Sequence, residues 1–502
     1  MKLYTILKWT RRVLAVAVIA LITYFFIFSS ANATGIWAAL LKVQFIPGVL
    51  GITTGGALTV TVILLLTLLF GRVYCSMLCP LGIYQDIVNR IAWFIKSRQK
   101  RRTHYSKPND GIRYGILAFV TVCVVFGFTY PLVWLDPYSL FGKMAVNLGR
   151  PLVAGITGAE YYTWSWPAFA FAAAFFTFIT LLAAFRGRYY CNTICPVGTL
   201  LGLVSKISMF RIQVNESECR HCLLCGKSCK SYCLDSSGIK VDHSRCVVCL
   251  NCIGSCNTKA VTYAFAWKKK VAIARKKEEP TTENKSRRAF LISALGAGVS
   301  AGAGVVLLNR FKGKARVKVG AGLPPGAGNL ERLQDKCIAC HACVAACPSH
   351  IIKPAYGELG WQGFLLPSVS YENGFCGFEC QKCQEVCPSG ALQRMSLEDK
   401  KLTKLGVARF TLENCIVYKD GTDCGACDEH CPVKAVAMMP REGSDKLFPK
   451  VTPKVCIGCG GCEYICPARP KAIVVIPMAE QRRADAPLID VQIKVDIEGF
   501  GF

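Results

Sequence analysis

The sequence predicts a membrane-embedded α-helical bundle joined to small α+β domains that are organised by metal-binding cysteines. Three observations predict this fold class. Long apolar segments alternate with basic stretches, and 30 of the 502 residues are cysteine, most of them in tight runs. A short cysteine-containing sequence also occurs twice, each time directly after an apolar segment. A chain of this length has room for several domains.

Four of the apolar segments are long enough, or nearly so, to cross a bilayer as helices. They run roughly over residues 13–28, 56–70, 112–132 and 166–185. We therefore predict a four-helix membrane domain at residues 1–210, rather than the buried helices of a soluble core. The stretch at residues 90–107 is rich in lysine and arginine, which predicts that it lies in the cytoplasm with the amino terminus. The loops near residues 31–52 and 133–165 would then face outward.

The short repeat supports this layout. Gly71–Pro80 reads GRVYCSMLCP and Gly187–Pro196 reads GRYYCNTICP, so each copy carries a C-x3-C-P motif. One copy follows the second apolar segment and the other follows the fourth. The membrane domain is therefore predicted to contain two similar helical hairpins, with both cysteine loops on the cytoplasmic side.

A fifth apolar segment lies in the middle of the chain. The basic linker at residues 266–288 ends in Arg287-Arg288, and the apolar segment at 289–308 follows. Paired arginines before such a segment are typical of a twin-arginine export signal. The alternative is an ordinary membrane helix that follows two arginines by chance. We expect an uncut anchor helix that places residues 325–480 in the periplasm, and we find no motif in the tail at 481–502.

Two cysteine runs lie within residues 211–265, which we predict to be a cytoplasmic domain with a bacterial-ferredoxin-like α+β fold. In bacterial ferredoxins a C-x2-C-x2-C loop gives three thiolates to one [4Fe–4S] cluster, and a following cysteine binds the partner cluster. The first cluster is therefore assigned to Cys219, Cys222, Cys225 and Cys256. The second is assigned to Cys246, Cys249, Cys252 and Cys229. Cys233 is close to Cys229 in sequence and could replace it.

Four further runs occupy residues 325–480 and predict four more [4Fe–4S] clusters. The first two runs are Cys337, Cys340, Cys343, Cys347 and Cys376, Cys380, Cys383, Cys387. The last two are Cys415, Cys424, Cys427, Cys431 and Cys456, Cys459, Cys462, Cys466. The runs could pair in sequential or in nested order. We favour the nested order, in which the first run pairs with the fourth and the second with the third.

Disulfides and zinc are the alternatives to clusters at these runs. Disulfide scaffolds are usually short secreted chains, and cysteines so close in sequence have poor geometry for disulfides. Zinc sites usually combine two separated C-x2-C pairs. The runs therefore indicate iron–sulfur clusters as the cofactors.

The two C-x3-C-P loops predict a seventh [4Fe–4S] cluster. Neither loop alone supplies four thiolates, but packing with pseudo-twofold symmetry would bring their four cysteines together at the cytoplasmic surface. These are Cys75, Cys79, Cys191 and Cys195. Free thiols or a redox disulfide are the alternatives. Seven clusters would use 28 of the 30 cysteines and leave only Cys123 and Cys233.

The formal net charge of +28 indicates a membrane topology more than a nucleic-acid partner. Cluster-bound thiolates would offset a large part of this charge. The remaining lysines and arginines gather near the apolar segments, where such residues set orientation in the membrane. We expect no nucleic acid among the partners of the chain.

These motifs together resemble two known families. The helical unit with two C-x3-C-P loops and a two-cluster domain, residues 1–265, resembles NapH, a membrane quinol dehydrogenase subunit of periplasmic nitrate reductase systems. The twin-arginine segment with four runs, residues 286–480, resembles NapG and its methylamine-utilisation relative MauM. NosR and the copper-handling protein CcoG also carry two C-x3-C-P loops. The departure from the pattern is the fusion into one chain, which makes the export signal internal.

The resemblance implies a quinol dehydrogenase module in the inner membrane. Such a module would pass electrons from the quinone pool to a periplasmic reductase or multihaem cytochrome, with other subunits possible. We find no molybdopterin, flavin, nucleotide or C-x-x-C-H haem motif, which indicates that the terminal chemistry belongs to a partner. An assembly factor that reduces a metal or cofactor on another protein is the alternative, and so is electron flow towards quinone.

The candidate quinone site lies in an outward loop. Trp134, Asp136 and Tyr138 combine an aromatic wall with a carboxylate that could accept quinol protons. The alternative is an interfacial aromatic belt with a helix cap. Lys42 and Gln44, in the other outward loop, are further candidates.

Overall fold

The computed structural model describes residues 2–28, 36–52, 56–95, 105–126, 128–158, 165–235, 239–266, 322–441 and 444–486. Arg287-Arg288 and the segment at 289–308 lie outside these residues, so the twin-arginine anchor stays a prediction. Contacts divide the chain into two compact units. The first comprises Met1–Lys314, Gln334–Ala345 and Val386–Gly390, and the second comprises Ala315–Leu333, Ala346–Glu385 and Ala391–Phe502.

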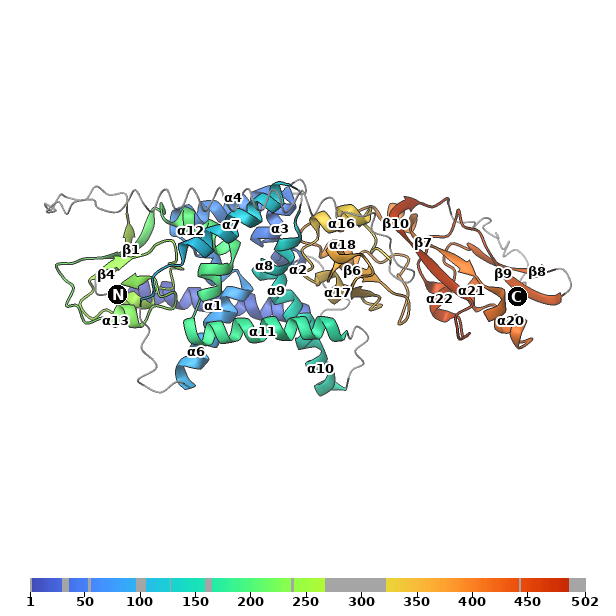
Figure 1. Ribbon diagram of the computed structural model, residues 1–502, viewed down its shortest axis with the longest axis horizontal. Helices are drawn as coiled ribbons and strands as arrows, with labels where there is room; N and C mark the ends of the chain where they lie inside the picture. Colours follow the sequence, from blue (N-terminus) through green and yellow to red (C-terminus); the bar gives the residue numbers. More distant parts are fainter. Residues whose placement is uncertain are drawn as a thin grey trace, which may run out of the picture. The chain divides into compact units, whose positions relative to one another are not determined.

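The amino-terminal part of the first unit is helical (Figure 1). Its first helices are α1 (Lys2–Phe28), α2 (Ile36–Lys42), α3 (Phe45–Leu50), α4 (Gly56–Phe70), α5 (Tyr74–Met77) and α6 (Pro80–Ile95). They are followed by α7 (Asp110–Val125), α8 (Tyr130–Leu135), α9 (Pro137–Met144), the π-helical turn η2 (Ala145–Gly149) and α10 (Arg150–Thr157). The last are α11 (Trp166–Arg186), the π-helical turn η3 (Tyr190–Ile194) and α12 (Pro196–Ser205).

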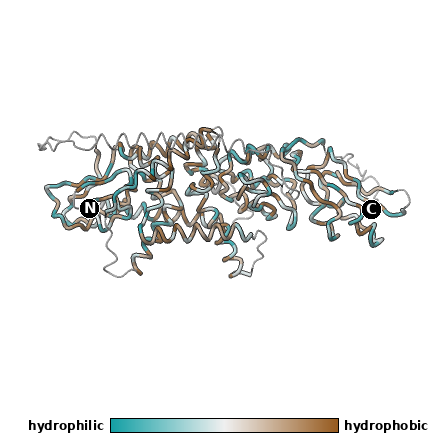
Figure 2. Tube along the Cα trace, in the orientation of Figure 1, coloured by the Kyte–Doolittle hydropathy of each residue, from teal (hydrophilic) through white to brown (hydrophobic). Residues whose placement is uncertain are grey.

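Helix length supports two of the four predicted membrane spans. Among the described residues, Tyr4–Phe28 and Trp166–Arg186 are long and apolar enough to cross a membrane. The apolar helix α4 has 15 residues, and α7 has 16 and ends at Val125 instead of near residue 132. A full span takes about 20 residues. In Figure 2, hydrophobic residues are frequent along α1, α4 and α11.

Helix α1 connects the other parts of the first unit. A helix of 27 residues is about 40 Å long. Near its start, the Tyr4 hydroxyl donates to the Tyr263 carbonyl (3.3 Å), and further along Arg11 donates to the Ser76 carbonyl beside the first cysteine loop (3.4 Å). At its end the Phe26 carbonyl accepts from Nε of Arg150 (2.8 Å).

A small α+β domain follows the helices, as predicted for residues 211–265. Its elements are β1 (Phe210–Val214), α13 (Leu224–Lys227), β2 (Leu234–Asp235), β3 (Lys240–Val241), α14 (Asn251–Gly254) and β4 (Val261–Phe265). Strands β1 and β4 pair antiparallel and enclose both cysteine runs between them in sequence. The buried Ile212 on β1 packs in a core that includes cysteines of both runs. The core of this domain is therefore built around the cysteine loops.

The described chain after residue 322 consists of short helices and two-stranded antiparallel sheets. Its first elements are α16 (Leu330–Lys336), α17 (Ala342–Ala346), β5 (Ile352–Pro354), η4 (Trp361–Gly363), β6 (Pro367–Val369), α18 (Lys382–Glu385) and α19 (Leu397–Lys401). The remaining elements are β7 (Thr403–Phe410), η5 (Leu412–Asn414), α20 (Ile416–Lys419), α21 (Ala426–Glu429), β8 (Val436–Arg441), β9 (Ser444–Val451), α22 (Gly461–Ile465) and β10 (Ile473–Arg483). The sheets pair β5 with β6, β7 with β10 and β8 with β9.

Candidate iron–sulfur sites

The two copies of the repeat bring their four cysteines together inside the helical bundle. Each cysteine is at most 4% exposed. Burial raises the pKa of the Cys79 thiol well above its usual value, and the neighbouring Cys191 and Cys75 sulfurs raise it further. Burial and the neighbouring Cys191 and Cys79 sulfurs have the same effect on Cys195. The two loops therefore form one buried site with four sulfurs, which we call the four-cysteine site.

Local structure places these sulfurs in the same way in both copies. Cys75 lies on α5 and Cys191 on η3, while Cys79 and Cys195 directly precede the prolines that begin α6 and α12. The Cys195 sulfur accepts a hydrogen bond from the Gly198 amide (3.3 Å). Amides at a helix start favour a thiolate over a thiol. A Cβ on Gly82 or Gly198 would collide with the carbonyl of the first cysteine in its own loop, so both glycines permit this close packing.

The arginine of each copy crosses to the other copy. Nη2 of Arg72 donates to the Cys191 carbonyl (3.2 Å), and Nη1 of Arg188 donates to the Cys75 carbonyl (2.7 Å). Both arginines are almost fully buried. This exchange ties the two loops together and gives the site the predicted pseudo-twofold symmetry.

A buried carboxylate pairs with only one of these arginines. Asp86 on α6 accepts two hydrogen bonds from Arg188, at 2.8 and 2.9 Å, and lies 3.2 Å from Nζ of Lys230. Burial alone would raise the pKa of Asp86, but the charges of Arg188 and Lys230 outweigh it and hold that pKa well below its usual value. Gln85, next in sequence, donates from Nε2 to the Cys191 sulfur (3.1 Å).

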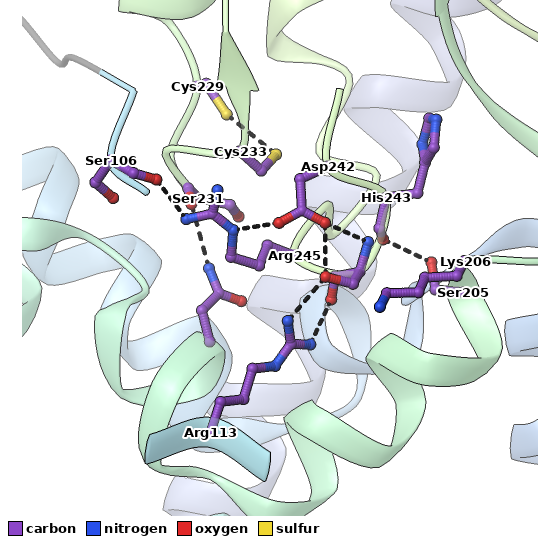
Figure 3. A network of polar contacts seen from close by, with 12 residues as sticks. Ser106, Arg113, Ser205, Lys206, Cys229, Ser231, Cys233, Asp242, His243 and Arg245 are labelled. Atoms are coloured by element: carbon purple, nitrogen blue, oxygen red, sulfur yellow. Dashed lines mark hydrogen bonds and ion pairs between the residues drawn. The ribbon is translucent and has the colours of Figure 1, made fainter. Parts of the chain in front are cut away.

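The ferredoxin-like domain of residues 211–265, which we call the inner domain, contacts the helical bundle through the loop before Cys246 (Figure 3). In that loop Asp242 accepts hydrogen bonds from the amide and hydroxyl of Ser244, at 3.0 and 2.6 Å. Arg113 on α7 donates to the Ser244 hydroxyl (2.8 Å), and Ser205 on α12 donates to the His243 carbonyl (3.0 Å). These contacts hold the domain against the end of the bundle where the four-cysteine site lies.

One cavity in this domain is lined by the four cysteines of the second cluster assignment and by Cys233, the alternative to Cys229. They are Cys229, Cys233, Cys246, Cys249 and Cys252. The sulfurs of Cys229 and Cys233 are 3.5 Å apart. A hydrogen bond from Cys233 lowers the pKa of Cys229 to about 6 and raises the pKa of Cys233.

The backbone of the runs fits an anionic cluster. In four runs the second and fourth residues after the first cysteine have positive φ. They are His221 and Leu223, Val248 and Leu250, Ala339 and His341, and Gly458 and Gly460. Alternating right- and left-handed residues turn successive N–H groups towards one point, as they do at phosphate and iron–sulfur sites. Within the described ranges no three His, Cys, Asp or Glu side chains are arranged to hold a single metal ion, whereas cluster ligands surround a larger core.

The four cysteine runs at residues 337–466, which we call the outer runs, pair in sequential order: the first with the second and the third with the fourth. The nested order that we favour from the sequence is therefore wrong. Burial raises the pKa of Cys337 to about 12, and Cys387 of the second run is near enough to raise it further. Burial also raises the pKa of Cys376 in the second run, and the nearby Cys347 sulfur of the first run raises it further. Spacing could not decide this point because each run supplies three ligands by itself and only the fourth depends on tertiary packing.

The last two runs form the second pair. One cavity is lined by four of their cysteines, three from the third run and one from the fourth. They are Cys415, Cys424, Cys427 and Cys466. The remaining fourth ligand, Cys431, is among the sulfurs that raise the pKa of Cys456 and Cys459, after burial. The long loop between Cys415 and Cys424 therefore still returns both residues to one site.

Two family models match the chain. A 4Fe-4S binding domain matches residues 52–102 and 168–215, which contain the two copies of the repeat. A 4Fe-4S dicluster domain matches residues 336–391 and 422–469. Each of these matches takes in cysteines of two consecutive outer runs, in agreement with the sequential pairing.

The relatives agree with these models. The ferredoxin-type protein NapG of Escherichia coli is 33% identical over 168 residues, which cover 31% of this chain and 70% of that protein. The chain belongs to the NapG family. The methylamine utilization ferredoxin-type protein MauM of Methylobacillus flagellatus is 33% identical over 165 residues, 31% of this chain and 67% of that protein. The ferredoxin-type protein NapH of Haemophilus influenzae is 26% identical over 169 residues, 34% of this chain and 50% of that protein. No solved structure matches the chain.

This NapG-family chain is thus an iron–sulfur electron-transfer protein that binds [4Fe–4S] clusters and associates with membranes. The expected likeness to a fusion of NapH-type and NapG-type parts is confirmed. Arg72, Arg188, Gln85 and Asp86 were not predicted as site residues. The repeated Gly-Arg was the available signal for the arginines, whereas Gln85 and Asp86 have no counterpart in the second copy and left no signal.

The structure separates the quinone-site candidates of this NapG-family chain. Asp136 is buried and accepts from the Ser139 amide (2.8 Å), so it caps α9 as the alternative interpretation requires. Tyr138 is also buried, which raises the pKa of its hydroxyl, and the neighbouring Cys340 sulfur raises that pKa further. Trp134 packs instead against Phe171 of α11, with ring centroids 4.9 Å apart.

Proposed function

We propose that the chain holds seven [4Fe–4S] clusters and serves as a quinol dehydrogenase module between the membrane quinone pool and a periplasmic redox partner, such as a nitrate reductase-type system. The observation that carries this proposal is the four-cysteine site. It lies inside the helical bundle, with ferredoxin-like sites on either side of it along α1. Bound clusters would supply one-electron transfer, and contacts along α1 support this order of the sites.

The contacts of α1 support this order. The inner domain contacts the start of α1 at Tyr4, and the first cysteine loop contacts it at Arg11. The end of α1 contacts Arg150, which also donates to the Ala345 carbonyl in the first outer run (2.6 Å). The three sites therefore follow one another along a helix about as long as a membrane is thick.

Iron analysis tests the cluster number. Anaerobically purified protein should contain about 28 iron atoms and 28 acid-labile sulfides per chain, because each of seven cubanes holds four of each. A content of about 24 would mean that the four-cysteine site holds no cluster. Stoichiometric zinc at any site would overturn the cluster assignment there.

We further propose that quinol binds near Gln44, Asp136 and Tyr138. Two buried donors in this region, the Tyr138 hydroxyl and Nε2 of Gln44, have no hydrogen-bond partner within the described part of the chain. The Tyr74 hydroxyl donates to Oε1 of Gln44 (2.9 Å). Buried donors without partners are rare and call for a ligand or a water.

Asp136 supplies a proton acceptor for this site. Burial raises the pKa of Asp136 to about 7, which suits proton transfer at neutral pH. Burial also raises the pKa of Tyr74 and Tyr138, and the Asp136 carboxylate adds to both shifts, so the carboxyl group is near both rings.

Stopped-flow reduction by a soluble quinol analogue tests the quinol site. Asp136→Asn should slow cluster reduction by quinol at least tenfold, while reduction by dithionite stays unchanged. Trp134→Phe, a neighbouring change that keeps the packing on Phe171, should have little effect. If Asp136→Asn is reduced by quinol at the wild-type rate, then quinol binds elsewhere.

We propose that residues 219–256 are cytoplasmic and that residues 337–466 are periplasmic. The lysine- and arginine-rich stretch at 90–107 and the Arg287-Arg288 pattern support this orientation. Protease treatment of intact spheroplasts should cleave the region at 337–466 and spare that at 219–256. Protection of both regions until the membrane is ruptured would contradict the periplasmic partner.

A further inference from the structure

The two repeat arginines are equivalent in sequence but not in charge environment. Arg188 has the buried carboxylate of Asp86 as its partner. The position that corresponds to Asp86 in the second copy is Gly202, where even a Cβ would collide with Arg113 and crowd the Ser244 carbonyl. There is therefore no room for a matching carboxylate beside Arg72.

Apart from its contact with the Cys75 sulfur, Arg72 is hydrogen-bonded to neutral groups. Its Nη1 donates to Oδ1 of Asn192 (2.9 Å) and to the Ser244 carbonyl (3.0 Å), and its Nη2 to the Cys191 carbonyl. No carboxylate in the described part of the chain lies within ion-pair distance of Arg72, and its Nε has no partner there. The side chain is nevertheless completely buried. An isolated buried charge costs several kcal/mol unless an opposite charge compensates it.

The nearest anions available to Arg72 are the cluster sulfurs. Nη2 of Arg72 lies 3.8 Å from the Cys75 sulfur. Four thiolates around an oxidised cubane carry a net negative charge, which would compensate the guanidinium. The residues present thus fit an anionic cluster at the four-cysteine site, because without one this arginine would be buried unpaired.

Arg72 also contacts the loop before Cys246, which belongs to the second cluster site of the inner domain. Ser244, whose carbonyl accepts from Arg72, is two residues before Cys246. Asn192, the other acceptor, donates from Nδ2 to the Ser231 carbonyl between Cys229 and Cys233 (3.3 Å).

We propose that Arg72 is the shared counter-charge of the four-cysteine site and of the inner site at Cys246, and that it raises the reduction potentials of both. A fixed positive charge favours the reduced, more negative cluster. Arg72 is a positioning residue here, and the inference rests on the proposed clusters at these two sites.

Redox titration of the full-length chain, followed by electron paramagnetic resonance, tests the proposal. Arg72→Gln should move the potentials of two clusters to more negative values and leave the four outer clusters unchanged. Arg72→Lys keeps the charge and should restore most of both potentials. Arg113→Gln is the matched control, because Arg113 also donates to the Ser244 carbonyl (2.9 Å) but, unlike Arg72, makes no hydrogen bond to a cysteine in the described part of the chain. It should leave both potentials close to wild type.

Asn192→Asp keeps the test decisive if Arg72→Gln does not fold. It gives Arg72 the carboxylate that Arg188 already has, so it should lower the same two potentials while Arg72 stays in place. Asn192→Ala, which removes the hydrogen bonds without adding charge, should shift them much less. Unchanged potentials in both Arg72→Gln and Asn192→Asp, or an equal shift of all clusters, would overturn the proposal. Absence of the four-cysteine cluster from the wild-type protein would instead overturn the proposed function.

Discussion

The four-cysteine site and the ferredoxin-like sites build the same kind of ligand set in different ways. Each ferredoxin-like site is proposed to take three cysteines from one run and one from the partner run, as in the cavity lined by Cys415, Cys424, Cys427 and Cys466. The four-cysteine site takes two from each of two loops that are more than a hundred residues apart in sequence. Its geometry therefore depends on the packing of two helical hairpins, whereas theirs depends mainly on local backbone.

Buried polar groups reflect this difference. The four-cysteine site is held by buried arginines that cross between its loops and by Asp86, which compensates one of them. Four of the ferredoxin-like runs use backbone amides, which alternating positive-φ residues turn inward. A site made from distant loops thus requires side-chain charges for its assembly, and a site made from one loop does not.

The largest expected effect is the loss of one whole cluster from the four-cysteine site. Replacing any one of Cys75, Cys79, Cys191 and Cys195 by serine should remove the same cluster, because each supplies one of its four ligands. Iron content should fall by about four atoms per chain, and the other clusters should remain. Different spectroscopic losses for Cys75→Ser and Cys191→Ser would show that the loops do not share a site. Cys123→Ala, a buried cysteine outside all sites, is the control and should lose no iron.

The ferredoxin-like sites should show the contrasting pattern, in which one run affects two clusters. Cys387→Ser should perturb the cluster of Cys337 and Cys340, whereas Cys383→Ser, in the same run, should perturb the cluster of Cys347. Mössbauer or electron paramagnetic resonance spectra of the two variants would distinguish these clusters. Loss of the same signal in both variants would contradict the sequential pairing.

Asp86→Asn should destabilise the bundle by about 3–5 kcal/mol, because it leaves Arg188 as an uncompensated buried cation. Thermal unfolding in detergent, followed by circular dichroism, measures the effect. Asp242→Asn is a useful control, since Asp242 is half-buried and pairs with Arg245 in the loop before Cys246. A smaller loss for Asp86→Asn than for Asp242→Asn would refute the role of Asp86.

The smallest expected effect concerns the extra thiol in the inner domain. Cys233→Ala should keep the full iron content and move one potential to a more negative value, because it removes a hydrogen bond to the Cys229 sulfur. Cys229→Ser should instead lose or convert that cluster. After most of the other fourth cysteines, the residue three positions later has a positive φ. Tyr232 has a positive φ at this position after Cys229, which supports Cys229 as the ligand. Full iron content in Cys229→Ser would mean that Cys233 takes its place.

The sequence by itself determined the chemistry of this chain. The runs at 219–256 and 337–466 identified iron–sulfur sites because three ligands of each cubane lie within a short loop, where spacing is enough. The repeated C-x3-C-P sequence likewise predicted that Cys75 and Cys191 meet, because equivalent sequences after equivalent helices pack in equivalent ways. The sequence also predicted the small α+β domain around the runs at 219–256.

Tertiary structure decided where the fourth ligand of each outer site comes from and which charged groups meet. Nothing in the spacing of the outer runs required Cys387 to join Cys337, because the fourth ligand comes from a separate loop. The compensation of Arg188 by Asp86, and the lack of a carboxylate beside Arg72, depend on Gly202 lying against Arg113 and Ser244. The repeat makes the two arginines look alike in sequence, but the charge that each one faces is set by residues of other helices.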